Sequence, residues 1–305
     1  MSRAVQVAQG ADRERTAERL LKSSAAKFYD PDVDVDWSAE PVPGMYYQPE
    51  HRLSLYGTPL WEQLSAEQRV ELSRHEAASV ASNGIWFEVI LMRMLLKEVY
   101  QGDPRSNHVQ YALTEIADEC RHSVMFGKMS EKLGCPAYGP GRKGLALGKF
   151  FRATANPVEI FAAALFVEEV LDALQREATK DDDLQPLVRD VMRIHVVEEA
   201  RHMRYAAEEL ARQWETLRGS RRFVSSVRLA IACMTAAERL VHPRAYGAVG
   251  LDITEAKAAA RANPHWQATL AFASREVMAD FEELGLLDVA PARWIYRRAG
   301  LWPTD

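Results

Sequence analysis

Apolar residues recur at helical spacing along most of the chain, which predicts α-helices from about residue 61 almost to the end. Outside one proline-rich segment, the sequence has no alternating run of β-branched residues long enough for a useful strand. Helix starts and stops are well marked and give roughly eight helices. These marks are the capping pair Ser65 and Gln68, breaks at 102–107 and 180–183, and the pairs Asn156–Pro157, Asn263–Pro264 and Ala290–Pro291.

The first part of the chain has a different texture. Residues 1–12 are expected to fray, and a short amphipathic helix is expected from about Arg13 to Phe28. Residues 30–60 carry five prolines together with aromatic residues and alternating Asp and Val, which predicts an extended arm that wraps a domain. We therefore divide the chain into an N-terminal helix and arm at 1–60 and a helical domain at 61–305, within one structural domain overall.

Composition narrows the class of protein. The 305 residues are 48% hydrophobic and 27% charged, as in an ordinary globular protein. With 38 basic and 43 acidic side chains, and no basic cluster among aromatics, we expect no nucleic-acid partner. The longest apolar stretches, 161–167 and 229–237, are too short for a membrane span, and residues 1–30 contain no signal core. Three cysteines without CxxC spacing fit a reducing cytoplasm, where we expect the protein.

One unusual pattern, acid-Glu-x-Arg-His, occurs twice, as DECRH at 118–122 and EEARH at 198–202. A Glu and a His three positions apart share a helix face, so Glu119 and His122 can hold one ion, as can Glu199 and His202. A single Glu-x-x-His is expected by chance about once in a chain of this length. Two extended copies 80 residues apart are much harder to obtain by chance, and they indicate a metal site.

A four-helix di-metal site needs one further Glu from each of the two remaining helices. Glu88 lies 31 residues before Glu119, and Glu168 lies 31 residues before Glu199. In the first hairpin, both arms from the carboxylate to the turn are about 20 Å long at 1.5 Å per residue. In the second hairpin the arms are equal within a turn. Both pairs of carboxylates are therefore predicted to meet at the same level of the bundle.

The same arithmetic tests neighbouring acids. Glu76 and Glu98 are excluded, because their arms differ from the partner arm by more than two turns. Glu169 is not excluded, and only the matched interval favours Glu168 over it.

His195 precedes Glu199 by four positions and shares a stripe with His202. It is either a further ligand or a core histidine bonded to a neighbour. As a ligand, it completes a set of four carboxylates and three imidazoles, whose negative charge two divalent cations would cancel. Mixed oxygen and nitrogen donors suit iron or manganese better than zinc.

Other residues near the motifs have two interpretations each. The flanking charged residues could orient the ligands from outside or form ordinary salt bridges: Asp118, Arg121, Glu198 and Arg201. Nearby apolar residues are more often core than substrate pocket: Trp86, Phe87, Met92, Met94, Phe126 and Phe166. Cys120 points off the ligand stripe and is expected to pack. No catalytic residue beyond the ligands is identified.

The paired motifs resemble those of the ferritin-like di-iron oxygenases, and HVVEEARH at 195–202 resembles the p-aminobenzoate N-oxygenase (AurF-type) family. The similarity extends to the aromatic arm at 46–69 and to DFEELGLL at 280–287. The resemblance implies an all-α, ferritin-like four-helix bundle core with additional helices and an extended N-terminal arm. Carried over by motif, the family's ligands fall on Glu119, His122, Glu168, His195, Glu199 and His202. Glu88 is placed by hairpin geometry.

The resemblance also implies a reaction. Two ferrous ions would reduce O2 to a diferric peroxo unit, which oxidises the nitrogen of an aromatic amine toward hydroxylamine, nitroso or nitro products. The expected partners are such a small-molecule substrate and an external electron donor. A homodimer is the expected assembly.

Three alternatives keep the metal cluster and change its use. The first is hydroxylation or desaturation of C–H bonds, for example on an acyl group bound to a carrier protein. The second is a ferroxidase or iron-storage module, against which the length, the arm and the extra C-terminal helices argue. The third is a radical-generating subunit like that of ribonucleotide reductase, which needs a tyrosine close to the metals and a partner subunit.

Overall fold

The computed structural model describes residues 13–302, which form α-helices, connecting segments and one short 3-10 helix. Within these residues the only β-type pairing is an isolated bridge between Tyr46 and Leu184. The all-α prediction is therefore confirmed. Residues 1–12, for which fraying was predicted, lie outside the described residues.

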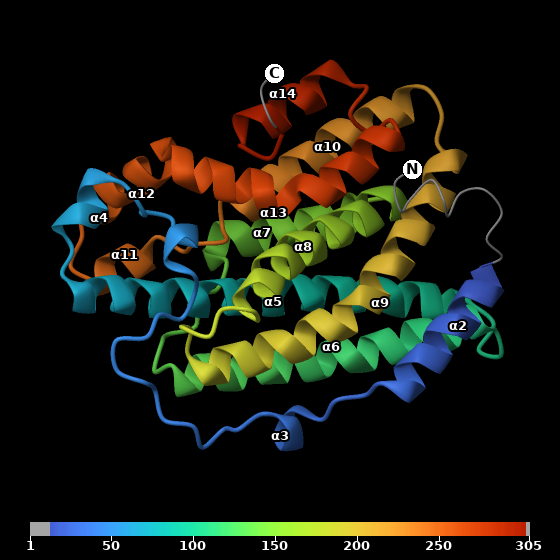
Figure 1. Ribbon diagram of the computed structural model, residues 1–305. Helices are drawn as coiled ribbons and strands as arrows, with labels where there is room; N and C mark the ends of the chain where they lie inside the picture. The colour runs from blue at the N-terminus through green and yellow to red at the C-terminus, as the bar shows by residue number, and fades with distance from the viewer. Residues whose placement is uncertain (1–12, 303–305) are drawn as a thin grey trace.

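Four long helices form the centre of the molecule (Figure 1). They are α5 (Ala66–Gln101), α6 (Asn107–Lys132), α8 (Pro157–Ala178) and α9 (Pro186–Thr216). The sequential pairs α5–α6 and α8–α9 are the most extensive helix contacts, and α6–α9 and α5–α8 contacts close the bundle. The two predicted helical hairpins thus lie side by side as a helical bundle.

The predicted helix boundaries lie where the polar signals stand. Ser65 and Gln68 form a complete capping box at the start of α5. The Ser106 side chain accepts the Val109 N–H at the start of α6, and the Asn156 side chain caps α8 ahead of Pro157. These caps satisfy backbone N–H groups that have no partner inside the helix, so they fix where each ligand-bearing helix begins.

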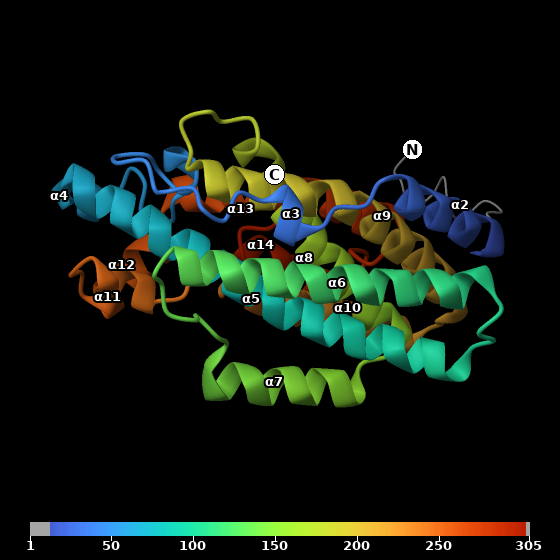
Figure 2. The same cartoon turned by 90° about the horizontal axis from the view of Figure 1, so that it is seen from below.

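Helix α2 (Arg13–Ala26) lies along α6 and α9 and agrees with the helix predicted from Arg13 (Figures 1 and 2). Its Glu14 carboxylate accepts the backbone N–H groups of Asn107 at 2.7 Å and His108 at 3.3 Å. An acid at a helix N-terminus is stabilising, because the free N–H groups carry partial positive charge. The first helix therefore also caps α6.

The proline-rich segment is only partly extended. It contains α3 (Pro31–Asp34), the 3-10 helix η1 (Glu50–Arg52) and α4 (Pro59–Gln63). Asp30 and Thr58 cap α3 and α4, each of which begins with proline. The prediction of roughly eight helices was accordingly low, because short helices of this kind have too few residues for a periodic signal. The boundary predicted at residue 60 stays a prediction.

The C-terminal half covers α8 on the side away from α6 (Figure 1). Helices α10 (Ser220–Ala237) and α13 (Pro264–Glu283) pack on α8, and α14 (Ala290–Arg298) packs on α10. Two shorter helices, α11 (Arg244–Ala248) and α12 (Ile253–Ala262), lie near α4 at one end.

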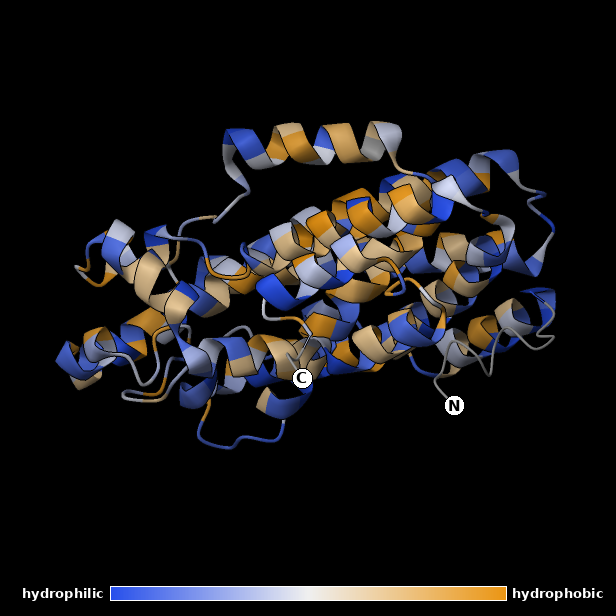
Figure 3. Ribbon diagram, turned by 90° about the horizontal axis from the view of Figure 1, so that it is seen from above, coloured by the Kyte–Doolittle hydropathy of each residue, from blue (hydrophilic) through white to orange (hydrophobic). Residues whose placement is uncertain are grey.

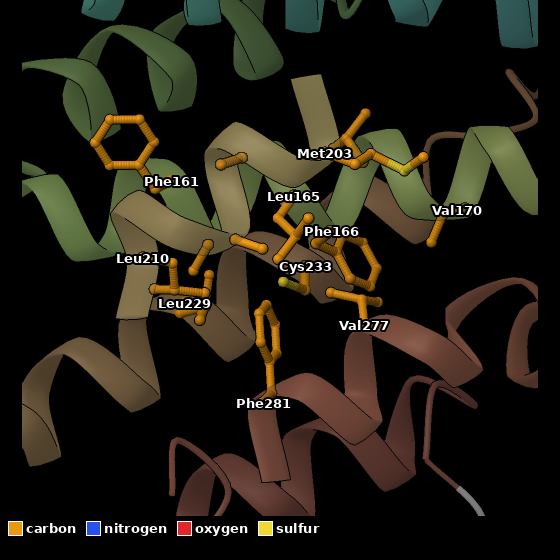
Figure 4. Close-up of a cluster of buried hydrophobic side chains, with 14 of the residues drawn as sticks. Phe161, Leu165, Phe166, Val170, Met203, Leu210, Leu229, Cys233, Val277 and Phe281 are labelled. Carbon is orange, nitrogen blue, oxygen red and sulfur yellow. The ribbon is translucent and has the colours of Figure 1, made fainter. Parts of the chain in front are cut away.

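Figure 4 shows how α8, α9, α10 and α13 share one apolar core. Phe166 and Phe281 are at most 1% exposed, and Leu165, Leu210 and Leu229 are fully buried. Each such side chain contributes about 1.5–3 kcal/mol by leaving water. This core holds one face of α8 in place and leaves its other face for the centre of the bundle.

Helix α5 has a stretch long and apolar enough to cross a membrane, the one such helix among the described residues. Its central turns are buried against α6 and α8, and its buried face carries Glu76 and Glu88. Its apolar composition is explained by this place in the bundle.

Helix α7 (Gly141–Thr154) is set apart from the other helices (Figures 2 and 3). None of its described residues is buried, although it carries Leu145, Leu147 and Phe150. It was not predicted as a separate helix, and its exposed apolar side chains distinguish it from every helix of the bundle.

Candidate metal centre

All seven residues predicted as ligands lie inside the four-helix bundle, and each is at most 3% exposed. Helix α5 supplies Glu88 and α8 supplies Glu168, while the other five come from α6 and α9: Glu119, His122, His195, Glu199 and His202. No lysine or arginine is among them. Such a concentration of buried acids and imidazoles is costly unless cations or protons compensate it.

The seven residues form three overlapping groups whose ligand atoms lie within 4.8 Å of one another. One group is the pair of motifs, Glu119 and His122 with Glu199 and His202. The other two groups are Glu88 with His122 and His195, and Glu168 with His195 and Glu199. Shared members make the three groups one continuous cluster, with donors for more than one ion.

Carboxylate oxygens and imidazole nitrogens face each other across α6 and α9. Nδ1 of His122 lies 3.0 Å from Oε1 of Glu199 on the other helix. Nδ1 of His202 lies 3.1 Å from Oε1 of Glu119 and 3.1 Å from Oε1 of Glu199. Glu119 and Glu199 therefore both face the two motif histidines, which places these acids between the two sides of the cluster.

His195 is oriented by a residue that the sequence analysis missed. Its Nδ1 lies 2.7 Å from Oε1 of the buried Gln175 on α8 and donates to that oxygen. In a neutral imidazole the other nitrogen, Nε2, then carries a lone pair. Nε2 lies 3.5 Å from Glu199 and 3.6 Å from Glu88, both carboxylate oxygens. A lone pair facing two acids needs a cation between them, as a metal site provides.

Several buried ligand atoms have no hydrogen-bond partner among the described residues, namely Oε2 of Glu168, Oε2 of Glu199 and Nε2 of His195. Leaving a buried polar atom unpaired costs about 1–3 kcal/mol, and more for a charged group. All three atoms belong to the same cluster. The donor set is thus incomplete without a cation, which is the arrangement expected of residues that hold metal ions.

The pKa values show how the cluster behaves when protons are its only cations. Burial raises the pKa of Glu168 well above its usual range, and the nearby charges of Glu199 and Glu119 raise it further. Burial also opposes ionisation of Glu199, but the charges of His202 and His195 outweigh it and hold that pKa well below its usual range.

The motif histidines show the complementary shift. Burial disfavours the charged imidazole of His122, yet its hydrogen bonds to Glu119, Glu198 and Glu199 raise its pKa well above the usual value. The charges of Glu199 and Glu119 do the same for His202 against its burial. Protons thus stand where cations would bind, so metal binding is expected to release them.

A second set of charged residues contacts the histidines from outside in a crossed pattern. Glu198 on α9 lies 2.8 Å from Nε2 of His122 on α6, and Asp118 on α6 lies 3.3 Å from Nε2 of His202 on α9. Each motif thus supplies the acid that orients the histidine of the other motif. By accepting from Nε2, these acids leave Nδ1 free to face the cluster.

The two arginines of the motifs pair with the same acids. Arg201 lies 3.4 Å from Asp118 and 3.6 Å from Glu198, and its side chain is 7% exposed. Arg121 bonds to Asp118 and stacks over Phe28 of the N-terminal segment. Both interpretations of the flanking residues therefore apply at once, because the salt bridges hold the acids that face the imidazoles.

Acids that the hairpin arithmetic excluded lie outside the cluster. Glu76 is buried but accepts from the backbone N–H and hydroxyl of Ser54. Glu98 is only partly buried. The structure brings Glu168 to the cluster, and Glu169 belongs to none of the three groups among the described residues. Cys120 is exposed, with its sulfur 3.4 Å from that of Met92.

Three further residues join the site without having been predicted. Gln175 is seven positions after Glu168, two helical turns along the same face, and that spacing was a usable signal. Ser123 donates to Oε2 of Glu88 at 2.9 Å. Glu115, 1% exposed, precedes Glu119 by four positions, as His195 precedes Glu199.

Comparison with known proteins gives one family and several relatives. The sequence model of the family described as P-aminobenzoate N-oxygenase AurF matches residues 10–285. Uncharacterized protein Rv0885 of Mycobacterium tuberculosis (strain H37Rv) and uncharacterized protein Mb0909 of Mycobacterium bovis are each 28% identical over 248 residues, covering 79% of this chain and 73% of the relative. Uncharacterized protein MT0908 of Mycobacterium tuberculosis (strain CDC 1551) is 29% identical over 228 residues, covering 72% and 67%. All matches include the ligand-bearing helices or most of their length.

Proposed function

The chain belongs to the P-aminobenzoate N-oxygenase AurF family, and from this premise we propose that it is a non-haem di-iron oxygenase acting on an aromatic amine. The observation that carries the proposal is the cluster of seven buried donors, three of whose atoms have no hydrogen-bond partner among the described residues. A solvated helix face or an ordinary salt-bridge network would not leave such atoms unpaired in the protein interior.

The proposed metal ligands are Glu88, Glu119, His122, Glu168, His195, Glu199 and His202. Four carboxylates balance the charge of two divalent ions, and imidazole with carboxylate is a donor set suited to iron or manganese. Bound there, the two iron ions would supply the reduction of O2 and the transfer of one oxygen atom.

The chain's own residues would prepare the ligands for this role. Glu198 and Asp118 accept from Nε2 of His122 and His202, which directs the Nδ1 lone pairs inward. Gln175 does the converse for His195, since it accepts from Nδ1 and directs Nε2 inward. Because every proposed ligand is almost fully buried, the helices also exclude bulk water from the reacting groups.

In the proposed reaction, one oxygen atom of O2 enters an N–H bond of the amine and the other leaves as water. The balancing electrons come from an external donor and the protons from solvent. We propose cytoplasmic location and a homodimer as the setting.

Anaerobic titration of the metal-free protein with ferrous iron tests the proposal. We expect about two iron ions per chain. Exposure to oxygen with 4-aminobenzoate and an electron donor should then give hydroxylamine, nitroso or nitro products, and a parallel panel of C–H substrates separates nitrogen from carbon oxidation. Failure to bind iron or manganese would sink the proposal, and products oxidised only at carbon would replace the amine with the C–H alternative.

A further inference from the structure

A large cavity lies between α7 and the bundle. Its volume is about 470 Å³, and α5, α8 and α10 form its walls while α7 forms the outer side. Figures 2 and 3 show α7 held away from these helices, with apolar residues along it. The glycines of α7 permit the approach that does occur, since a Cβ at Gly148 would lie 3.7 Å from Ile90 of α5.

This cavity reaches the candidate metal centre through one residue. Glu168 is among its lining residues, although that side chain is only 3% exposed. Glu168 is also the proposed ligand whose Oε2 has no hydrogen-bond partner among the described residues. A molecule filling the cavity would therefore have one end next to the proposed metals.

The size of the cavity excludes a close fit to a single aromatic ring. A cavity of about 150 Å³ is enough to bind benzene. The volume here is about three times larger. A one-ring amine would leave most of the apolar wall in contact with water.

Apolar side chains that face solvent gather around this cavity. Trp86, Leu145, Leu147, Phe150 and Ile231 line it, and each is at least 40% exposed. Exposed apolar surface of this extent is typical of a binding site, because covering it with a ligand is favourable. Of the apolar residues that the sequence analysis assigned to the core, Trp86, Phe87, Met94 and Phe166 line the cavity instead of, or as well as, packing in the core.

The charged groups at the cavity are almost all cationic. Apart from Glu168, the ionisable side chains that line it are Arg93, Lys149, Arg228 and Arg239. Arg228 pairs with Glu159 and Arg239 bonds to the Pro140 carbonyl. Arg93 and Lys149 are exposed, and within residues 13–302 no ion pair is recorded for either. They favour an anionic group on the ligand.

We propose that this cavity is the substrate pocket and that its substrate is an extended, mainly apolar molecule of two or more linked rings with an anionic group. The reacting end lies toward Glu168. This inference rests on the proposed function, because it takes Glu168 as a metal ligand, but its test does not depend on turnover.

The test measures binding of two probes, 4-aminobenzoate and 4′-aminobiphenyl-4-carboxylate, which differ by one ring. Titration follows the fluorescence of the full-length protein, both iron-loaded under anaerobic conditions and metal-free. We expect the two-ring probe to bind about tenfold more tightly or better in both states, since it buries more apolar surface. Equal affinity, or tighter binding of the one-ring probe, would overturn the proposal.

Variants then locate the binding site. Ala164→Phe places a ring inside the cavity and should weaken the two-ring probe by about tenfold or more. Gly148→Leu fills the cavity from α7, so it provides a second test if Ala164→Phe does not fold. Ala146→Phe adds the same bulk to an exposed position of α7 that does not line the cavity, and it should change affinity by less than about twofold.

The outcomes separate the two proposals. A protein that binds the two-ring probe but no iron keeps the pocket and loses the di-iron function. A protein that binds iron and oxidises 4-aminobenzoate, but shows no preference for the larger probe, keeps the function and loses this pocket. If the cavity-filling variants bind the two-ring probe as tightly as Ala146→Phe does, the pocket is also lost.

Discussion

The two helical hairpins of the bundle supply almost the same residues to the cluster, yet they differ at one position. Helices α6 and α9 each carry an acid, a Glu and a His, and each acid faces the histidine of the other helix. One turn earlier, α9 has His195 and α6 has Glu115. The shared part explains how a buried site can be built twice from one pattern, and the difference shows where its two halves need not act alike.

The terminal acids of the hairpins also differ. Glu88 accepts from the hydroxyl of Ser123 at 2.9 Å, whereas Oε2 of Glu168 is unpaired within the described residues and Glu168 lines the large cavity. The side of the cluster near Glu168 is therefore the more open to change, and we expect substrate to approach there.

The largest effect is expected from the acids between the two halves. Oε1 of Glu199 lies within 3.5 Å of all three imidazoles, while Glu119 faces only His122 and His202. Glu199→Ala should weaken iron binding by more than about 100-fold, since even residues behind the ligands are worth about 10–100-fold. Glu119→Ala should cost less. Anaerobic titration of both variants measures the order, and a greater loss in Glu119→Ala would contradict it.

The next effect concerns the position at which the hairpins differ. His195→Ala removes a nitrogen that faces Glu88 and Glu199, so it should weaken one iron site by about 10–100-fold and alter the optical spectrum after oxygen exposure. Burial raises the pKa of Glu115 well above its usual range, so that side chain is neutral, and Glu115→Gln should change iron affinity by less than about threefold. An unaltered spectrum in His195→Ala would show that this histidine is structural.

A smaller and more even effect is expected from the crossed acids. Glu198→Gln and Asp118→Asn each remove the charge behind one motif histidine, and each should cost about 10-fold in iron affinity. The two losses should agree within about threefold if the crossed arrangement works equally in both directions. Circular dichroism of the metal-free variants controls for folding. A loss confined to one of them would mean that the two motifs are not equivalent.

The smallest effect is a dependence of stability on pH. The pKa values of His122 and His202 are raised in the folded protein, so their protonation stabilises the metal-free protein fully below about pH 6.5, their usual pKa. This contribution is lost as pH rises through the raised values. Metal replaces the protons, so the difference in melting temperature between iron-loaded and metal-free protein should widen with pH by a few degrees. A difference that narrows would contradict the assignment.

Much of the bundle could be predicted because its signals are local. Capping residues such as Ser65 and Asn156 mark helix starts in a few positions, and equal arm lengths in each hairpin were enough to select Glu88 and Glu168 over Glu76 and Glu98. The seven side chains converge as the spacing predicted, although their role as ligands stays a prediction.

The parts that could not be predicted depend on contacts between distant segments. Nothing in the spacing of α6 and α9 shows that Glu198 faces His122, because that depends on how the two helices are rotated about their axes. The cavity likewise depends on where α7 lies, and its wall residues Trp86 and Phe166 have the same apolar character as core residues. Periodicity identifies an apolar face but not what covers it.

The most direct test of the central claim is X-ray diffraction from crystals of the iron-loaded protein at the iron absorption edge. The account predicts two anomalous peaks per chain inside the four-helix bundle, among Glu88, Glu119, Glu168, Glu199 and the three histidines. A bundle without iron at that place, or iron bound only at the protein surface, would contradict it.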